Sequence, residues 1–278
     1  MKIAMLSDIH ANLAALEATA ADIDRWQPDY VIVGGDVVNR GPRPRECLDF
    51  VRARARTQGW QCIIGNHEEY VLYHAQPDAV RRGPDFDVRR ISYWTYEQLN
   101  GDVSVIGAWP FQHSLRVNGS GELRAVHASM LGTRSGIHAA TSDAELRVKI
   151  APPPAVLIAG HTHLPLIRRV DDTLVVNAGS VGLPFDGDRR AGYARLTLHD
   201  NGWQAEIVRL DYDYDRADRD FEDTDFLSGA GPLAELIRDE FRCARSNLFE
   251  WSSRYQAEVM AGVLTLEEAA RRYWADRS

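Results

Sequence analysis

Residues able to bind metal ions follow five short apolar runs in this sequence. A buried parallel strand reads as such a run, and in layered α/β folds functional side chains collect just beyond the carboxyl ends of the strands. We therefore expect one site, built from oxygen and imidazole ligands for more than one metal ion. The apolar runs, each given with the ligand-type residues that come after it, are Ile3–Leu6 with Asp8 and His10, Tyr30–Val33 with Asp36, Cys62–Ile64 with Asn66 and His67, Leu123–Val126 with His127, and Val156–Ala159 with His161 and His163.

Two of these segments place a glycine directly before closely spaced ligand-type residues. They are Gly65-Asn66-His67-Glu68 and Gly160-His161-Thr162-His163. A glycine at this point lets backbone and side chains come near a bound group. Asp8-Ile9-His10 and Gly35-Asp36 say little alone, but the ordered combination of all these segments is far more specific than any member.

Alternating strands and helices must position these residues. After Ile3–Leu6 a helical pattern begins at Asn12, a favoured N-cap residue, and stops at Pro28. A second helix is expected from about Pro44 to Arg56. The order strand, helix, strand, helix, strand implies parallel pairing with right-handed crossovers.

The strands come closer together in the second half of the chain. The turn-type sequence His199-Asp200-Asn201-Gly202 predicts a hairpin between the last two of them. We therefore expect a second, more antiparallel sheet, and an α/β fold with four layers, an α/β/β/α sandwich of two mixed β-sheets flanked by helices. The strands expected here are Leu123–His127, Ala155–Ala159, Leu174–Asn177, Tyr193–Leu198 and Trp203–Leu210.

Two segments differ in composition from these alternating strands and helices. Many aromatic residues lie among charges between residues 66 and 112, which predicts a helical insertion at about 68–112 over or beside the site, or an aromatic satellite core under a long connection. We expect residues 1–210 to form the main domain. Residues 211–278, an acidic stretch followed by helical patterns, are expected to pack on it.

The composition is that of an ordinary globular chain of 278 residues. A net charge of −8 argues against general nucleic-acid binding, because phosphate backbones are bound mainly through Lys and Arg. There is no room for a cleaved signal before the first strand and no apolar run long enough for a membrane span, so a cytoplasmic protein without membrane partners is expected. The three cysteines, in no metal-type spacing, fit reduced and buried thiols.

In their order along the chain, these residues resemble the calcineurin-like metallophosphoesterase superfamily, in particular its small bacterial and archaeal phosphodiesterase-type members. The family blocks D-x-H, G-D, G-N-H-[DE], H and G-H-x-H stand here between residues 8 and 163, and the resemblance reaches to about residue 210. It implies two divalent transition-metal ions. In that arrangement Asp36 bridges both ions, Asp8, His10 and His163 complete the first, and Asn66, His127 and His161 complete the second. Such mixed donors suit Mn, Fe, Zn, Co or Ni better than Ca or Mg.

The loop after Asp36 also resembles the G-D-x-V-D-R-G signature of the Ser/Thr protein phosphatase branch. Arg40 matches the arginine that grips phosphate there, although an exposed loop arginine is the alternative. Asn39 stands where that branch has an aspartate orienting the catalytic histidine, here His67. An amide oxygen could accept a hydrogen bond from His67 without supplying charge, so a less basic His67 is expected. The double glycine after His127 is absent, which makes a protein substrate less expected.

The resemblance implies an enzyme, a binuclear metal-dependent phosphoesterase that hydrolyses a small phosphodiester by attack of a metal-bridging hydroxide. His67 would protonate the leaving oxygen. A phosphomonoesterase, or a nucleotide or protein phosphatase with the same site, is the near alternative. A catalytically silent scaffold of the same fold is a third reading, and the C-terminal helices could support a homodimer.

Overall fold

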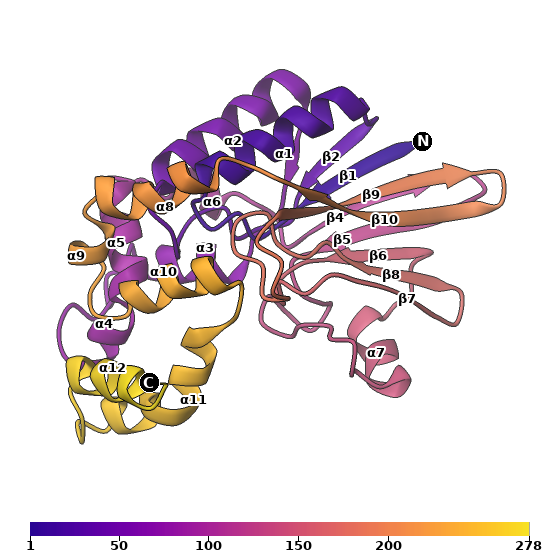
Figure 1. Cartoon of the computed structure of the whole chain (residues 1–278). Coiled ribbons are helices and arrows are strands. Elements are labelled where there is room, and N and C mark those ends of the chain that lie inside the picture. The colour runs from indigo at the N-terminus through magenta and orange to yellow at the C-terminus, as the bar shows by residue number, and fades with distance from the viewer. Residues whose placement is uncertain (278) are drawn as a thin grey trace.

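The computed structural model describes residues 1–277, and its strands form two five-stranded mixed sheets that lie face to face (Figure 1). The first sheet has the strand order β10-β9-β1-β2-β3. Strands β1, β2 and β3 run parallel, and β9 pairs with β1 in the antiparallel sense. The bounds are β1 Lys2–Leu6, β2 Tyr30–Val33, β3 Gln61–Cys62, β9 Ala191–His199 and β10 Gly202–Leu210.

The second sheet has the order β4-β5-β6-β8-β7. Its three central strands are parallel to one another, and the edge strands β4 and β7 are antiparallel to their neighbours. Parallel strands end at the same edge, so both sheets deliver the ends of their central strands to one side of the molecule. The bounds are β4 Gln112–Val117, β5 Gly121–Val126, β6 Val156–Ala159, β7 Leu166–Val170 and β8 Thr173–Asn177.

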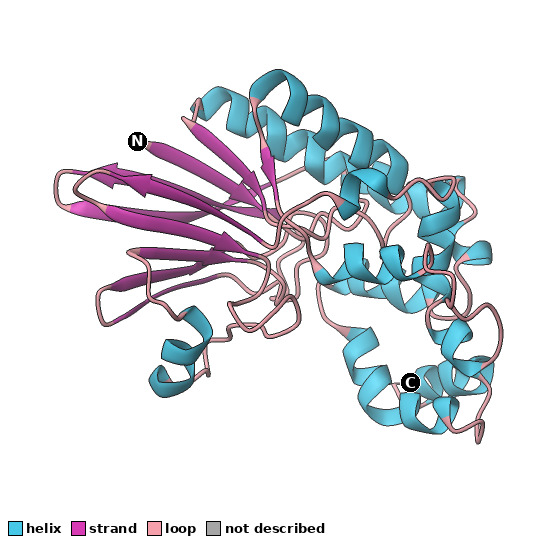
Figure 2. Cartoon of the chain, turned by 180° about the vertical axis from the view of Figure 1, so that it is seen from behind, coloured by secondary structure: helices cyan, strands magenta, loops and turns pink. Residues whose placement is uncertain are grey.

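Three apolar layers hold the sheets and their helices together. Ile3, Met5 and Ile32 of the first sheet meet Leu123 and Ile158 of the second in a fully buried layer. Helices α1 (Leu13–Trp26) and α2 (Pro44–Gln58) cover the outer face of the first sheet, and α7 (Asp143–Ile150) covers that of the second (Figures 1 and 2). The predicted four-layer α/β/β/α sandwich is thus confirmed.

Helix α1 begins as the sequence predicted. The Asn12 side-chain oxygen accepts a hydrogen bond from the Ala15 backbone N–H at 3.1 Å. This bond satisfies one of the N–H groups that a helix start leaves unpaired. Since Asn12 follows His10 by two residues, the cap also fixes the direction in which the chain leaves the end of β1.

The final hairpin corrects one expectation. We expected the strands around residues 193–210 in the second sheet, but β9 pairs with β1, with Ala4 opposite Arg195. The hairpin itself is present, with Gly202 opposite His199. Alternation along a strand identifies its buried face and does not identify its neighbour, so the sequence pattern could not assign the hairpin to a sheet.

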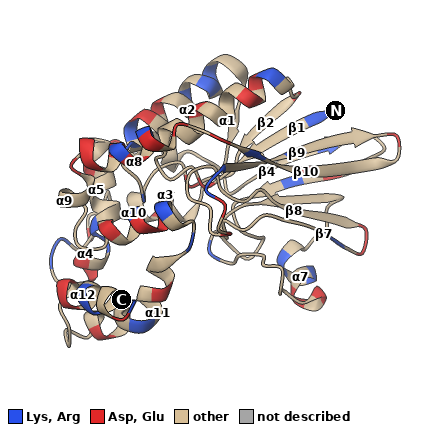
Figure 3. Cartoon of the chain, viewed as in Figure 1, with Lys and Arg blue, Asp and Glu red and all other residues tan. Residues whose placement is uncertain are grey.

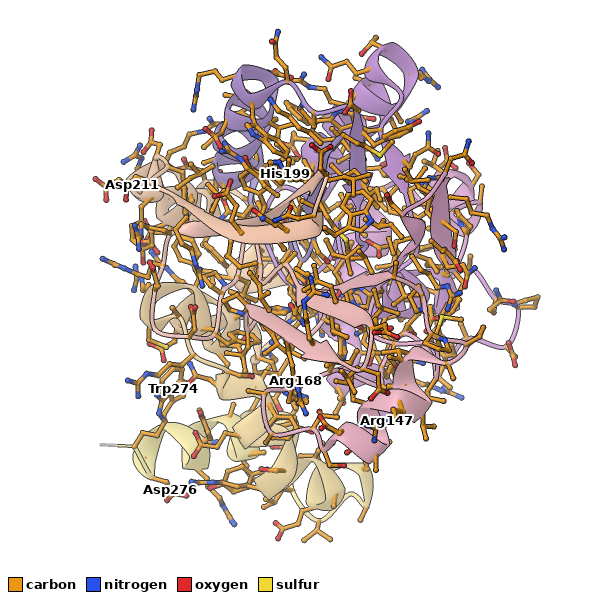
Figure 4. The ribbon with its side chains drawn as sticks, turned by 90° about the vertical axis from the view of Figure 1, so that its right-hand side faces the viewer. Arg147, Arg168, His199, Asp211, Trp274 and Asp276 are labelled. Atoms are coloured by element: carbon orange, nitrogen blue, oxygen red, sulfur yellow. The ribbon has the colours of Figure 1, made fainter. Side chains whose placement is uncertain are left out.

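Strands β4 and β7 were not predicted. Both lie at sheet edges and alternate between partly buried and exposed positions. Their sequences, QHSLRV and LIRRV, carry charged or polar residues at the exposed positions apart from Ile167 of β7, and they lack a continuous apolar run. Helix α7 is tied to β7 and its turn by ion pairs of Arg147 with Asp171 and of Arg168 with Asp143, and Figure 4 labels both arginines at this edge.

The remaining helices form a group on the side where the strands end (Figure 2). Ile91 and Trp94 of the insertion share a core with Phe226, Ile237 and other residues of the C-terminal part. The insertion therefore lies beside the strand ends and joins the C-terminal helices. It contains α3 Asn66–Tyr73, α4 Pro84–Val88, α5 Arg90–Gln98 and α6 Ser104–Gly107; the C-terminal part contains α8 Tyr214–Asp223, α9 Phe226–Gly229, α10 Ala234–Cys243, α11 Asn247–Met260 and α12 Leu266–Ala275.

The acidic stretch after residue 210 does more than face solvent. Asp220 is buried and accepts two hydrogen bonds from Arg43 at the start of α2, and Asp218 pairs with Arg238 and Arg242 of α10. Figure 3 shows acidic and basic residues intermixed along these helices. The stretch thus carries ion pairs that attach the C-terminal helices to the sandwich.

Two smaller expectations concern cysteines and membranes. Cys47 is buried, whereas Cys62 and Cys243 are partly exposed, and all three are free thiols. Burial raises the pKa of Cys62 to about 12, so its thiol stays protonated and unreactive. Within residues 1–277 no helix combines the length and apolar character that a bilayer crossing needs.

Candidate metal centre

The loops after five strands converge and bring together every metal ligand expected from the sequence. The ligands lie within a few residues of the ends of β1, β2, β3, β5 and β6. Two groups of ligand atoms form, and both include Asp36. The first contains Asp8, His10, Asp36 and His163; the second contains Asp36, His127 and His161.

The backbone at these loop positions is unusual. Non-glycine residues with positive φ are uncommon because Cβ approaches the backbone there, at a cost of order 1–3 kcal/mol each. The site concentrates them, since five of its seven expected ligands have a φ between 47° and 69°. Packing around the loops must stabilise this conformation, which turns each side chain back toward the centre. These five are Asp8, His10, Asp36, His161 and His163.

Backbone carbonyls fix the orientation of three imidazole rings. The Nδ1 atom of His10 lies 3.2 Å from the Asn39 carbonyl, and that of His127 lies 2.8 Å from the Gly34 carbonyl. The Nδ1 atom of His163 likewise faces the carbonyl oxygen of Leu183. A carbonyl only accepts, so each Nδ1 carries the proton and each Nε2 presents a lone pair to the centre.

Lone pairs then face one another across the site. The Nε2 atoms of His10 and His163 are 3.1 Å apart, and the Nε2 of His127 lies 3.3 Å from Asp36 Oδ2. The Nε2 atom of His127 is also 2.9 Å from the Asn66 side-chain oxygen. Contacts between two acceptors are unfavourable unless a proton or a cation lies among them.

Two buried carboxylate oxygens point to the same conclusion. Asp8 Oδ1 and Asp36 Oδ2 have no hydrogen-bond partner within residues 1–277, although both side chains are buried. The other Asp36 oxygen accepts a hydrogen bond from the His67 backbone N–H at 2.9 Å, which leaves Oδ2 for the centre. Unpaired buried oxygens are costly, so the donor set fits divalent cations bound by mixed oxygen and imidazole ligands.

Asn66 faces the same space from the start of α3. Its side-chain oxygen lies 2.8 Å from His161 Nδ1, in addition to its approach to His127. An amide oxygen that meets two imidazole nitrogens at hydrogen-bond distance has the position and chemistry of a metal ligand. The three residues therefore form a neutral donor set opposite the more acidic group around Asp8.

Small residues are needed where loops approach these ligands. A Cβ atom on Gly65 would lie 2.1 Å from Asp36 Oδ1, and one on Gly160 would lie 2.4 Å from Asp8 Oδ2. Neither approach is possible for a larger residue without displacing a carboxylate. The glycine before each ligand pair thus has the role that the sequence motif suggested, a close approach of backbone to the centre.

Glu68 holds the loop that carries Asp36, a role that sequence reasoning missed. Its buried carboxylate accepts hydrogen bonds from the backbone N–H groups of Asp36, Val37, Val38 and Gly65 at 2.7–3.3 Å. Burial and the neighbouring Asp36 charge raise the pKa of Glu68 to about 7, although the backbone donors oppose this shift. The acidic residue closing the G-N-H-E block was the available signal.

The electrostatics of the site favour a positive charge at its centre. Burial disfavours a charged His127, yet the charge of Asp36 raises the pKa of His127 to about 10. Burial lowers the pKa of His161 to about 4, and the charge of His127 adds to that effect. The raised pKa reflects the attraction of the Asp36 carboxylate for positive charge, at the place where a bound cation would lie.

His67 lies beside the centre, with its ring 4.9 Å from that of His10. Burial lowers the pKa of His67 to about 3, and the charge of Arg40 adds to the lowering, so the ring is neutral at pH 7. Asn39 Nδ2 donates to His67 Nδ1 at 2.8 Å, while Thr95 Oγ1 donates to the Asn39 oxygen at 3.3 Å. We expected the Asn39 oxygen to face His67, but its amide nitrogen does. The ring proton therefore sits on Nε2.

Arg40 is neither an exposed loop arginine nor a free phosphate ligand. Its Nη2 donates to Glu240 Oε2 of α10 at 2.5 Å, and its guanidinium lies 5.7 Å from the centre of the Phe185 ring. The Nε atom has no partner among the described residues. Glu240 is fully buried. Nothing in the sequence connected these two residues, which are 200 positions apart.

The four other histidines lie outside the two ligand groups, as the sequence reading expected. His74 is buried against Ser92, with its Nε2 2.9 Å from the hydroxyl. His199 is exposed at the end of the β9–β10 hairpin, where Figure 4 labels it. His113 and His138 also stand apart from the clusters.

Comparisons with known proteins agree with this geometry. A family model described as the calcineurin-like phosphoesterase superfamily domain matches residues 1–201. An uncharacterized protein of Methanocaldococcus jannaschii is 25% identical over 239 residues, which are 77% of this chain and 89% of the relative.

Two solved structures extend the likeness. The crystal structure of a metallophosphoesterase from Sphaerobacter thermophilus is 26% identical, with a TM-score of 0.65, and the match covers 88% of this chain and all of that one (100%). A hypothetical protein from Pyrococcus horikoshii OT3 has the same fold, with a TM-score of 0.70 at 18% identity over 88% of this chain and 98% of its own.

Proposed function

Because the chain belongs to the calcineurin-like phosphoesterase superfamily, we propose that it is a binuclear metal-dependent hydrolase of small phosphodiesters. The observation that carries this proposal is the shared carboxylate: Asp36 belongs to both ligand groups, and its buried Oδ2 has no partner within residues 1–277. A carboxylate that belongs to two groups of ligands is suited to holding two neighbouring cations.

We assign the first cation to Asp8, His10, Asp36 and His163, and the second to Asp36, Asn66, His127 and His161. Bound divalent cations of the Mn, Fe, Zn, Co or Ni type would activate water for in-line attack on phosphorus and neutralise phosphoryl charge. The protein contributes oriented donors, since backbone carbonyls hold three of the imidazole rings with their Nε2 lone pairs toward the centre.

His67 has the role of stabilising the leaving group. Its ring is neutral at pH 7, and Asn39 Nδ2 donates to Nδ1, so the Nε2–H is available to donate a hydrogen bond to the departing oxygen. That hydrogen bond stabilises the negative charge that develops on the leaving oxygen, while the ring keeps its proton. Asn39 is a positioning residue, because it selects the tautomer that can donate.

The preference for a diester rests on Arg40. Its guanidinium is paired with buried Glu240, so much of its positive charge is already compensated. A phosphodiester carries one negative charge and a monoester carries up to two near neutral pH, so a compensated arginine favours the diester. Hydrolysis of a phosphomonoester at the same site is the second candidate.

Metal analysis combined with an activity screen tests the proposal. Protein reconstituted with Mn²⁺ should hold about two ions per chain and hydrolyse bis-p-nitrophenyl phosphate faster than p-nitrophenyl phosphate. The Asp36→Ala variant should lose both ions, whereas His161→Ala should retain about one. His67→Ala should keep the metal and lose turnover on the order of a hundredfold or more. Bound metal without hydrolysis of either ester would instead support a silent scaffold, and a strong monoester preference would support the second candidate.

A further inference from the structure

A cavity of about 300 Å³ opens beside the metal centre. Asn39, Arg40 and His67 line its inner side, next to the Tyr70 ring, whose centre lies 5.1 Å from that of His67. Since His67 faces both the centre and this cavity, a group leaving a phosphorus atom at the centre would enter it. Cavities of this size accommodate small ligands.

Two segments distant in sequence build the outer walls. Val88 and Ile91 come from α4 and α5 of the insertion, while Leu248 and Met260 come from opposite ends of α11. Both segments lie on the side of the molecule where the strands end (Figure 1). Helix α11 lies beyond the residues 1–201 that the family model matches, so this wall belongs to a part of the chain outside the family domain.

The charges in the cavity are already paired. Arg40 donates to Glu240, and Arg89 Nε donates to both Asp85 oxygens at 3.0 Å. The rest of the lining combines the Tyr70 ring and four aliphatic side chains with neutral polar groups, which are Asn39, His67, Ser92 and Gln256. A ligand with a formal charge would find no unpaired counter-ion here, whereas an apolar ring would bury its faces.

We infer that this cavity is the leaving-group site of the enzyme and takes an uncharged, ring-sized, largely apolar alcohol. The inference rests on the proposed phosphoesterase function and deepens it by naming the substrate class. The insertion and the C-terminal helices are then specificity elements, because they supply the walls that the sandwich lacks. Leu248 and Met260 are specificity-determining residues.

Binding of the product alcohol tests the site separately from catalysis. The fluorescent phenol 4-methylumbelliferone, titrated into the metal-loaded wild-type protein, should bind, and the uncharged polyol myo-inositol should not displace it. Leu248→Trp and Met260→Trp, which fill the cavity, should each weaken binding roughly tenfold or more. Phe249→Trp is the matched control, because Phe249 neighbours Leu248 on α11 but is 77% exposed and does not line the cavity.

The outcomes separate the two proposals. Phenol binding that both cavity variants weaken, and that Phe249→Trp leaves unchanged, supports the site even if no ester is hydrolysed. Hydrolysis of aryl esters without phenol binding, or with binding insensitive to both variants, overturns the site and leaves the phosphoesterase proposal standing. Displacement by myo-inositol at similar concentration overturns the apolar character. Circular dichroism of each variant identifies one that has failed to fold, and the other cavity variant then decides.

Discussion

The guanidinium of Arg40 is joined to the carboxylate of Glu240 by a 2.5 Å hydrogen bond that links a loop of the metal centre to helix α10. The other Glu240 oxygen accepts from the Leu248 backbone N–H at 2.7 Å, at the start of α11. Through one buried carboxylate, the C-terminal helices are therefore tied to the edge of the site. The C-terminal part of the chain is thus connected directly to the residues proposed for chemistry.

Replacing Glu240 by Gln should change substrate preference. The amide keeps the shape of the side chain but removes the charge that compensates Arg40, so the site becomes more positive. The ratio of kcat/KM for the monoester over that for the diester should rise roughly tenfold, equivalent to about 1.4 kcal/mol. Steady-state kinetics with the two p-nitrophenyl substrates measures this ratio.

Asp220→Asn is the matched control for that experiment. It removes a buried carboxylate that pairs with Arg43 and also attaches the C-terminal helices. Its monoester-to-diester ratio should equal that of the wild type. An equal shift in both variants would mean that the ratio reports loosened helices rather than the charge of Arg40.

Replacing Asn39 by Ala should reduce turnover without removing metal. The His67 Nδ1 atom would lose its donor, so the neutral ring could place its proton on Nδ1 and withdraw it from the leaving oxygen. We expect kcat to fall on the order of a hundredfold with little change in KM. The ¹⁵N chemical shifts of the His67 ring should report the changed tautomer. An unchanged tautomer with reduced kcat would argue against the positioning role.

Glu68→Gln should destabilise the fold and the Asp36 loop together. A carboxylate that accepts from four backbone N–H groups would be replaced by an amide whose NH₂ faces donors. A loss of about 3 kcal/mol in the free energy of unfolding is expected, measured by urea denaturation of metal-free protein. Glu69→Gln, on the same helix and one-third exposed beside Arg134, should cost less than about 1 kcal/mol.

The buried His74 should make the free energy of unfolding decrease at acidic pH. Burial lowers the pKa of His74 to about 4, with Arg81 adding to the effect, against an ordinary value of 6.5. Below pH 6.5 the unfolded chain binds a proton that the folded chain does not, so stability falls between pH 6.5 and 4. The contribution is about 3 kcal/mol.

A His74→Gln variant should therefore lose less stability than the wild type between pH 7 and pH 4.5, as followed by denaturant unfolding. His199→Gln, at the exposed hairpin turn, should behave as the wild type does. Equal losses in all three proteins would assign the acid sensitivity to other groups.

Much of the sandwich could be predicted from the sequence because local sequence signals determine its elements. Apolar runs predicted the central strands, Asn12 predicted the start of α1, and the turn at 199–202 predicted the hairpin. Edge strands β4 and β7 were not predicted, because half-buried strands with charged residues lack a continuous apolar run. The pairing of β9 with β1 was not predicted, because long-range packing determines which strands are neighbours in a sheet.

For the candidate centre, the sequence by itself determined which residue types follow which strands, since ligands at the ends of parallel strands must share an edge. Tertiary structure alone decided what surrounds them. It placed Glu240 on Arg40, turned the Asn39 amide nitrogen toward His67, and set α11 across the cavity beside the centre. These contacts join residues up to about 200 positions apart, and no local propensity or spacing encodes them, because they depend on how whole helices pack.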